Sequence, residues 1–378
     1  MPAVRRPTVL HCMRDWGLPS ERFVPELVGS SRATRAIVVC GRRAGVTGGR
    51  LRTYEVGALA SRVAEQRQRR LRRGSIAVIA VAERARILHA HLGYWAAEAA
   101  VVARRLNRPL VVSLHGHDLL VEGPAMEEPH ALLEADVVIV PSAYLANAAV
   151  NFGIREDRLR IIPSGVDLSR LRFAERRPSA GPVVVTFAGR FVEKKGVLDA
   201  ARALALVQEQ RPDVEARFVG YGPLEGQLRR LLADLGLRAQ IWDGASPDAV
   251  VTAFADTHLV LTPSRTAPDG DAESLGLVNL EALASGIPVV TTQHGGIPEA
   301  VCSQAAALVP ERDVIALAAA ISDLLATPDR WPAMGRAGRA HVSQNFDPAA
   351  RAAEVEDLYL ALLQSFKRAD RPRLRLTG

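Results

Sequence analysis

The stretch that decides the fold is PSRTAPDGDAESLGLVNLEALASGIPVVTTQHGGIPEA, residues 263–300. The apolar run Leu259–Leu261 leads into it and predicts a buried strand, and Val289–Thr291 predicts a second strand. Between them, Leu275–Ala284 has the pattern of a helix. Strand, helix and strand in this order indicate a parallel α/β unit, because two parallel strands need a long crossover connection.

Two glutamates flank the start of this predicted helix. Glu273 precedes it, Glu281 lies on its second turn, and the N–H groups of Leu275, Gly276 and Leu277 are expected to point out of its first turn. Such a helix start binds anions. If the segment were helical throughout, the two carboxylates would lie about 12 Å apart along the axis. That is roughly the span of a sugar–diphosphate–ribose unit. A solvated helix face is the alternative interpretation.

The same pattern extends over the whole chain. Runs rich in Val, Ile and Leu, typical of parallel strands buried on both faces, alternate with helical patterns. Strands are predicted at Thr8–Cys12, Ala36–Cys40, Ile87–His89, Leu110–Leu114, Val137–Val140, Val183–Phe187, Ala216–Val219, Gln240–Trp242, Leu259–Leu261, Val289–Thr291 and Ala307–Val309. Helices are predicted at Tyr54–Arg73, Gly93–Asn107, Ala143–Asn151, Val197–Glu209, Leu224–Leu235, Pro247–Ala255, Leu275–Ala284, Val314–Ala326 and Pro348–Gln364.

A segment rich in Pro, Gly, Ser and Arg, residues 163–182, interrupts the alternation and predicts a linker. We therefore expect an N-terminal α/β domain at 1–165, a second α/β domain at 166–346, and a final helix with a basic tail at 347–378. The fold class is α/β, with two doubly wound parallel sheets facing a cleft. Ligands of such sheets bind beyond the carboxyl ends of the strands.

Polar residues gather at those strand ends. After Val183–Phe187 come Gly189, Arg190, Lys195 and Gly196. A glycine lets the backbone turn, and a guanidinium and an ammonium together can neutralise a diphosphate without a metal. An ordinary charged surface loop is the alternative.

A second group follows Leu110–Leu114. His115 is placed to face a reacting sugar, and Asp118 to hold the imidazole tautomer or a neighbouring group. Two residues that merely close a loop are the alternative. His89, His91, His115 and His117 offer a zinc site as an alternative, but this set lacks the usual ligand spacing, so we expect no metal site.

Composition and length favour a globular protein of two domains. The 378 residues exceed what one core usually serves, and no apolar run approaches the roughly 18 residues of a membrane span. The first residues lack the apolar core of a signal peptide. Cys12, Cys40 and Cys302 show neither disulfide nor zinc spacing. We therefore expect a cytoplasmic protein.

The net charge of +7 comes partly from two basic clusters, Gln66–Arg73 and Lys367–Arg375. Leu59 and Val63 precede the first cluster on its predicted helix, so peripheral contact with the inner membrane face is one interpretation. A solvated basic face is the other. Aromatic residues are not interleaved with the charges, so we expect no nucleic-acid partner.

Two glycine patterns raise the alternative of a nicotinamide oxidoreductase. Gly220-Tyr221-Gly222-Pro223 follows a predicted strand, and Gly45–Gly49 follows Ala36–Cys40. Both are weak, because Gly226 falls one position late for G-x-G-x-x-G and Pro223 removes an amide where a pyrophosphate needs one.

With these residues assembled, the chain resembles the retaining glycosyltransferases of family 4, which have the GT-B fold. It is most similar to their exopolysaccharide-type members. The family's E-x7-E motif matches Glu273 and Glu281, its G-R-x4-K-G element matches Gly189, Arg190, Lys195 and Gly196, its G-x-G-P turn matches Gly220–Pro223, its H-G-x-D element matches His115–Asp118, its serine matches Ser142, and its linker signature matches Ser164–Asp167.

The resemblance implies roles for these residues. Arg190 and Lys195, with Gly189 and the amides of Gly276 and Leu277, would hold the donor diphosphate. Glu281 would bind the ribose, Glu273 the donor-sugar hydroxyls, and His115 would contact the sugar and assist the reaction. Asp118, His91 and Arg22 are expected on the acceptor side. No cofactor or metal is implied, since the nucleoside-diphosphate sugar is a co-substrate.

Two departures from the family pattern bear on the acceptor and the hinge. The segment Leu18–Phe23 stands where many members have a Gly-Gly loop, and Ser164 stands where the linker usually has Asn. The predicted activity is transfer from a nucleotide sugar, with UDP favoured by family frequency, to a glycan, lipid-linked or small-molecule hydroxyl. The alternatives are the oxidoreductase and a catalytically silent sugar- or membrane-binding relative.

Overall fold

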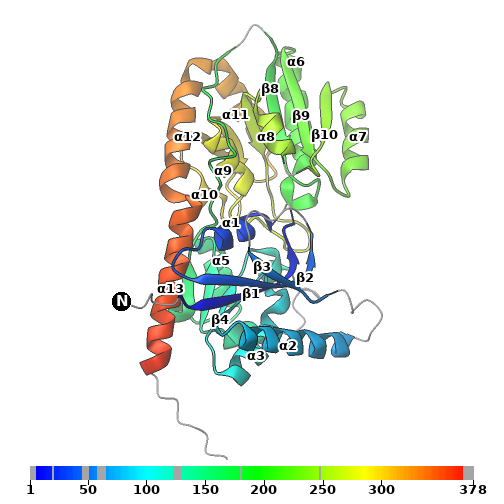
Figure 1. Cartoon of the computed structure of the whole chain (residues 1–378). Helices are drawn as coiled ribbons and strands as arrows, with labels where there is room; N and C mark the ends of the chain where they lie inside the picture. Colours follow the sequence, from blue (N-terminus) through cyan, green and yellow to red (C-terminus); the bar gives the residue numbers. More distant parts are fainter. Residues whose placement is uncertain are drawn as a thin grey trace, which may run out of the picture.

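The computed structural model describes residues 6–18, 21–44, 51–57, 65–121, 129–178, 181–246 and 248–368. Within them the chain forms two parallel β-sheets, each covered by helices on both faces (Figure 1). The predicted α/β class with two doubly wound sheets is confirmed. No helix in these ranges is both long enough and apolar enough to cross a membrane.

The first sheet has the order β3-β2-β1-β4-β5-β6-β7 in the described part of the chain, and all its neighbouring strands run parallel. Its strands are β1 Thr8–Trp16, β2 Arg35–Arg43, β3 Arg52–Glu55, β4 Ala85–His91, β5 Leu110–Ser113, β6 Val137–Val140 and β7 Leu159–Ile161. Side chains alternate between the faces, so Leu10 and Cys12 pack on one side and Val9 on the other.

Helices cover this sheet in two layers. One face carries α2 Glu65–Ala82, α3 Ala96–Leu106 and α5 Ala143–Asn151, and the other carries α1 Phe23–Gly29 and the end of the long α13 Pro348–Arg368. Short helical turns complete this half of the molecule, namely η2 Gly93–Trp95, α4 His117–Leu120, η4 Pro129–Glu134 and η5 Glu156–Arg158.

The second sheet has the order β10-β9-β8-β11-β12-β13 and is also parallel among its described strands. The strands are β8 Val183–Ala188, β9 Val214–Gly220, β10 Ala239–Asp243, β11 Leu259–Thr262, β12 Val289–Thr292 and β13 Ala306–Val309. The helices are η6 Glu193–Lys195, α6 Val197–Gln210, α7 Glu225–Asp234, α8 Ala249–Phe254, α9 Leu277–Ala284, α10 Ile297–Ala300, α11 Val314–Ala326, η7 Pro328–Arg330 and α12 Trp331–Asn345.

Strand order reverses once in each sheet, between β1 and β4 and between β8 and β11. A crevice opens at such a reversal, because the two connections leave toward opposite faces of the sheet. The loops that follow β8 and β11 carry the predicted residues Gly189–Gly196 and Pro263–Gly276. The topology therefore brings these two segments to one place.

The last helix, α13, ties the C-terminal end of the chain to the first sheet, and Figure 1 shows it running along that half. Glu356 on α13 accepts hydrogen bonds from the N–H groups of Arg32, Ala33 and Thr34, at 2.9, 3.0 and 2.7 Å. The hydroxyl of Tyr359 lies 2.5 Å from Nδ1 of His89 on β4.

Most predicted elements are present with shifted ends, but the predicted helix Tyr54–Arg73 is wrong. Residues 52–55 form strand β3 beside β2, and the helix that carries the arginine cluster, α2, begins at Glu65. Leu59, Val63 and the glycine run Gly45–Gly49 lie outside the described residues, as does the end of the basic tail. β7, α1 and α12 are not anticipated by the sequence patterns.

Candidate active site

The loop between β11 and α9 carries Glu273 and ends at a left-handed glycine. Gly276 has φ of +79° and is the N-cap of α9, so the helix begins at Leu277 rather than at Leu275. The separation of about 12 Å expected for Glu273 and Glu281 assumed a continuous helix. That assumption is wrong, because the chain turns at Gly276 before the helix starts.

The carboxylate of Glu273 pairs with a lysine from the loop after β8. Nζ of Lys195 lies 2.9 Å from Oε1 of Glu273, and both side chains are nearly buried. Burial disfavours the charged carboxylate, yet Lys195 and then Lys194 lower the pKa of Glu273 to about 2. Lys195, Glu273, Gly276 and Asn279 line one pocket with Phe187, Ala188, Thr262, Ser264 and Val278. An ionised acid and an ammonium thus share a desolvated pocket at the sheet's switch point.

Glycines allow this close approach of backbones. Gly196 has φ of +64°, and a Cβ atom there would lie 1.9 Å from the carbonyl oxygen of Pro263. A Cβ atom on Gly295 would lie 2.1 Å from the carbonyl oxygen of Glu273. Any other residue at these positions would push apart the loops that hold Lys195 and Glu273.

The Arg190 loop rests on the G-x-G-P turn. A Cβ atom on Gly220 would lie 2.0 Å from the carbonyl oxygen of Gly189, and one on Gly222 would lie 2.5 Å from that of Phe191. These glycines therefore serve the packing of one loop on another. The side chain of Arg190 is exposed beside this turn.

Glu281 lies on α9 opposite the N-terminal half of the molecule. Burial and then Glu26 on α1 raise its pKa to about 7, although Arg170 and Arg22 oppose the rise. Arg22, at the N-terminus of α1, donates from Nε to Oε1 of Glu26 at 3.0 Å. Arg22 therefore belongs to the same charged cluster as Glu281.

His115 follows β5 and lies beside the loop that carries Glu273. Neither of its ring nitrogens has a hydrogen-bond partner among the described residues, although both atoms are buried. Its ring packs on Phe23 with centroids 4.6 Å apart, and burial lowers its pKa to about 4. A Cβ atom on the next residue, Gly116, would lie 3.2 Å from Cβ of Ser274. A neutral imidazole with free nitrogens is thus held beside the Glu273 segment.

Asp118 binds the backbone around His115 and makes no hydrogen bond to the imidazole ring. Its carboxylate accepts from the N–H groups of His115, Gly116 and Gly93, at 2.9, 2.8 and 3.1 Å. The side chain is 1% exposed. With its oxygens turned to these amides, Asp118 shapes the loop.

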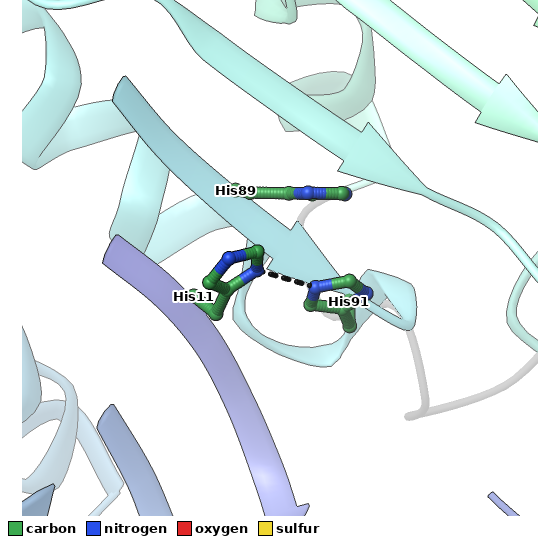
Figure 2. A group of neighbouring side chains, drawn as sticks. All are labelled: His11, His89 and His91. Carbon is green, nitrogen blue, oxygen red and sulfur yellow. Dashed lines mark hydrogen bonds between the residues drawn. The ribbon is translucent and has the colours of Figure 1, made fainter. Parts of the chain in front are cut away.

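His91 belongs to a buried cluster with His11 and His89 (Figure 2). Nδ1 of His11 lies 3.0 Å from Nε2 of His91, and His89 bonds to Tyr359 and to Ser113. One ring nitrogen from each of the three histidines lies within 4.8 Å of the others, but both nitrogens of His89 are engaged by Tyr359 and Ser113, and its ring is stacked on that of His91 with centroids 4.0 Å apart. This geometry favours a hydrogen-bonded core over metal ligation. His117, the remaining histidine of the zinc alternative, is exposed, and its Nδ1 lies 3.4 Å from Oδ2 of Asp271.

Several contacts of the site were not anticipated. Glu299 on α10 accepts from the N–H groups of Ala143 and Tyr144, at 2.6 and 2.9 Å, and so caps α5 from the other half of the chain. His294 and Glu311 contact the Glu273 loop. No spacing rule links residues so distant along the chain, and the sequence carries no signal for them.

Two family models match the chain: "Glycosyltransferase Family 4" at residues 26–170 and "Glycosyl transferases group 1" at 170–341. A GDP-mannose-dependent alpha-(1-6)-phosphatidylinositol monomannoside mannosyltransferase of Mycolicibacterium smegmatis is 34% identical over 275 residues, which cover 68% of this chain and 72% of the relative. An amylovoran biosynthesis glycosyltransferase of Erwinia amylovora is 28% identical over 242 residues, covering 61% and 58%.

Two solved structures resemble the whole chain. A glycosyltransferase from Rickettsia africae has a TM-score of 0.77 at 17% identity, covering 97% of this chain and 100% of that one. HepE from Anabaena, solved with UDP and glucose, has a TM-score of 0.73 at 21% identity, covering 93% and 99%. Both likenesses concern the fold, and they confirm the expected GT-B arrangement of two parallel-sheet domains.

Proposed function

Since the chain belongs to glycosyltransferase family 4, we propose that it transfers a hexosyl- or N-acetylhexosaminyl-type unit from a nucleoside-diphosphate sugar to a hydroxyl group with retention at the anomeric carbon. The observation that carries the proposal is the Lys195–Glu273 pair in the pocket between β8 and β11. This pocket offers a cation and an anion in the desolvated place where a charged leaving group and sugar hydroxyls would lie.

The site residues take distinct roles in this proposal. Arg190 and Lys195 hold the diphosphate, helped by the backbone turn at Gly189 and the amides of Gly276 and Leu277. Glu281 binds the ribose hydroxyls and Glu273 the sugar hydroxyls.

We propose the domain boundaries 1–165, 166–346 and 347–378, since the chain crosses between the halves where Val166 N–H donates to the carbonyl of Phe346.

The reaction follows from this placement. The acceptor oxygen attacks the anomeric carbon on the face from which the phosphate departs, the bond to the phosphate oxygen breaks, and that oxygen takes the acceptor's proton. Arg190 and Lys195 stabilise the charge that develops on the diphosphate, a task that a metal performs in other enzymes. Neutral His115 faces the sugar with a free nitrogen. We place Arg22 on the acceptor side; Asp118 and His91, both buried, act there only through the loops they support.

The donor base is the first property to test. The Mycolicibacterium relative is named for GDP-mannose and the Anabaena structure contains UDP, so both bases are candidates, and we prefer UDP because of its frequency in the family. We expect one nucleoside diphosphate among UDP, GDP, ADP and TDP to stabilise the purified protein by about 2.7 kcal/mol at 100 times its Kd, measured by thermal denaturation.

The matched variants for this experiment are Arg190→Ala and Arg330→Ala. Arg190 lies after β8 in the site, whereas Arg330 lies in η7, which follows the end of α11. The shift is expected to shrink in the first variant and persist in the second. Stabilisation by NAD alone would contradict the proposal and favour an oxidoreductase. A protein that no nucleotide stabilises would favour the silent binding relative.

We further propose that the acceptor is presented at a membrane surface, and α2 supports this. One side of this helix is exposed and changes from basic to apolar along the chain, and its residues recur at helical spacing. They are Arg67, Arg70, Leu71, Val78 and Val81. We expect the protein to sediment with anionic phosphatidylglycerol vesicles and at least five-fold less with phosphatidylcholine vesicles.

The double variant Leu71→Ser/Val78→Ser is expected to lose most of this sedimentation. Ile315→Ser is the matched control, because Ile315 is an equally exposed apolar residue on the other half of the chain. If the wild-type protein sediments with neither kind of vesicle, the result would contradict presentation of the acceptor at a membrane and favour a soluble acceptor.

A further inference from the structure

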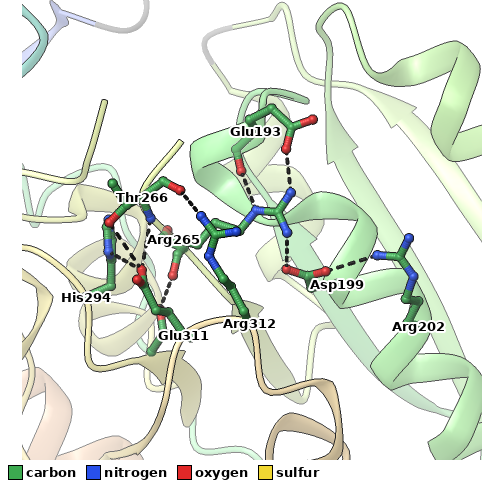
Figure 3. Close-up of polar contacts among 10 residues, drawn as sticks. Glu193, Asp199, Arg202, Arg265, Thr266, His294, Glu311 and Arg312 are labelled. Atoms are coloured by element: carbon green, nitrogen blue, oxygen red, sulfur yellow. Dashed lines mark hydrogen bonds and ion pairs between the residues drawn. The ribbon is translucent and has the colours of Figure 1, made fainter. Parts of the chain in front are cut away.

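The backbone of Glu273 is held at both ends of the residue by groups outside its own loop. Its N–H group lies 3.2 Å from Nε2 of His294, and its carbonyl accepts from the N–H of Gly296 at 2.9 Å. His294 itself is 4% exposed. Its other ring nitrogen, Nδ1, lies 2.8 Å from Oε2 of Glu311. Figure 3 shows His294 and Glu311 side by side at this end of the polar network.

These contacts determine the tautomer of His294. A backbone amide can only donate, so Nε2 must accept from Glu273 and must carry no proton. The proton of the neutral ring therefore lies on Nδ1, which donates to the carboxylate of Glu311. Burial lowers the pKa of His294 and favours this neutral form.

Glu311 links the same network to the start of the loop. Its Oε2 also accepts from the N–H of Thr266 at 2.9 Å, and Arg312 donates to the carbonyl of Thr266 at 2.6 Å (Figure 3). One carboxylate after β13 thus holds Thr266 directly and Glu273 through His294. The carboxylate of Glu273 takes no part in these bonds and stays directed to Lys195.

We propose that His294 and Glu311 are positioning residues, which together orient Glu273 toward the donor sugar without contacting the substrates. This inference rests on the proposed function, because it assigns the pair to the carboxylate that would bind the sugar hydroxyls. A displaced Glu273 would meet the sugar in the wrong place, and small displacements of a positioned group slow a reaction strongly.

The test compares kcat, KM and nucleoside-diphosphate affinity in His294→Leu, His294→Gln and Glu311→Leu. His294→Leu is expected to lower kcat at least ten-fold while the affinity for the nucleoside diphosphate changes less than two-fold, because Lys195 and Arg190 remain. Glutamine offers one acceptor and one donor side by side, as neutral histidine does, so His294→Gln is expected to keep kcat within about three-fold of the wild type.

A double variant separates positioning from independent damage. Because both residues act through one chain of bonds, His294→Leu/Glu311→Leu is expected to be no slower than the slower single variant. If the double variant instead loses kcat by the product of the two single-variant factors, the residues act independently and the inference is wrong. An unchanged kcat in His294→Leu would also overturn it. Thermal denaturation of each variant shows whether activity is lost because the protein unfolds. Unfolding would lower the concentration of active protein and leave kcat per folded molecule unchanged. Failure of the proposed function is distinguishable, since the wild-type protein itself would then show no transfer.

Discussion

Lys195→Met is expected to lower sugar transfer at least 100-fold and the free energy of unfolding by about 3 kcal/mol. The variant removes a proposed diphosphate ligand and leaves the ionised carboxylate of Glu273, 9% exposed, without its 2.9 Å partner. An unpaired buried charge is costly, and the carboxyl is expected to respond by binding a proton. Initial rates and urea denaturation measure the two effects.

The double variant Lys195→Met/Glu273→Gln separates stability from catalysis. It removes both charges, so most of the lost stability is expected to return while transfer stays absent. Lys194→Met is the comparison for a neighbouring pair, because Lys194 lies 2.9 Å from Asp271 in an equally buried setting. It is expected to cost similar stability but to retain more transfer. Full transfer in Lys195→Met would contradict the proposed role of this lysine.

Acidification from pH 7 to pH 5 is expected to lower the free energy of unfolding by about 3 kcal/mol. Burial lowers the pKa of His11 to about 3 and that of His115 to about 4, and burial also lowers the values of His89 and His91. In the unfolded chain each would titrate near its ordinary value of about 6.5. Below that pH the unfolded state binds more protons, so stability is lost as pH falls.

Carboxyl groups with a raised pKa, chiefly Glu281 and Glu21 and also Glu26, act in the opposite direction over the same range. Burial raises the pKa values of Glu281 and Glu21 to about 7, so the folded state gains their protons first and stability rises as pH falls. Each buried histidine is expected to contribute a loss of about 2 kcal/mol, and the four histidines outweigh these acids. Glu273 affects the pH dependence of stability only below about pH 4.3, the pKa of a glutamate carboxyl in the unfolded chain.

Urea denaturation at both pH values checks this expectation. His91→Gln is expected to reduce the difference between pH 7 and pH 5 by about 2 kcal/mol, whatever its effect on absolute stability. A wild-type protein equally stable at both pH values would mean that its folded and unfolded states take up the same number of protons over this range, which contradicts the expectation.

The sequence patterns predicted the central strands of both sheets and the edge strands of the second sheet, but they missed both edge strands of the first sheet. Buried strands such as Val137–Val140 are continuous apolar runs, and this one has the predicted bounds. β3, with the sequence RTYE, and β7, with LRI, are partly exposed edge strands. Their strand conformation comes from pairing with β2 and β6, which no local pattern records.

Helix α12 shows the same dependence on packing. It contains Gly335 and Gly338, which disfavour a helix in isolation. A Cβ atom on Gly335 would lie 2.6 Å from the carbonyl oxygen of Gly286, so the glycines are needed for close approach to the α9 region. Tertiary contact overrides propensity here.

The sequence by itself determined the two α/β units and the two loops that carry Lys195 and Glu273, because strand periodicity and loop chemistry are local. Only the tertiary structure decided that Lys195 pairs with Glu273, that His294 holds the Glu273 backbone, and that His91 is buried in a cluster. These outcomes depend on which strand lies beside which. That order arises from packing whole elements together, and the residues it joins, such as His11 and His91, lie far apart in the chain.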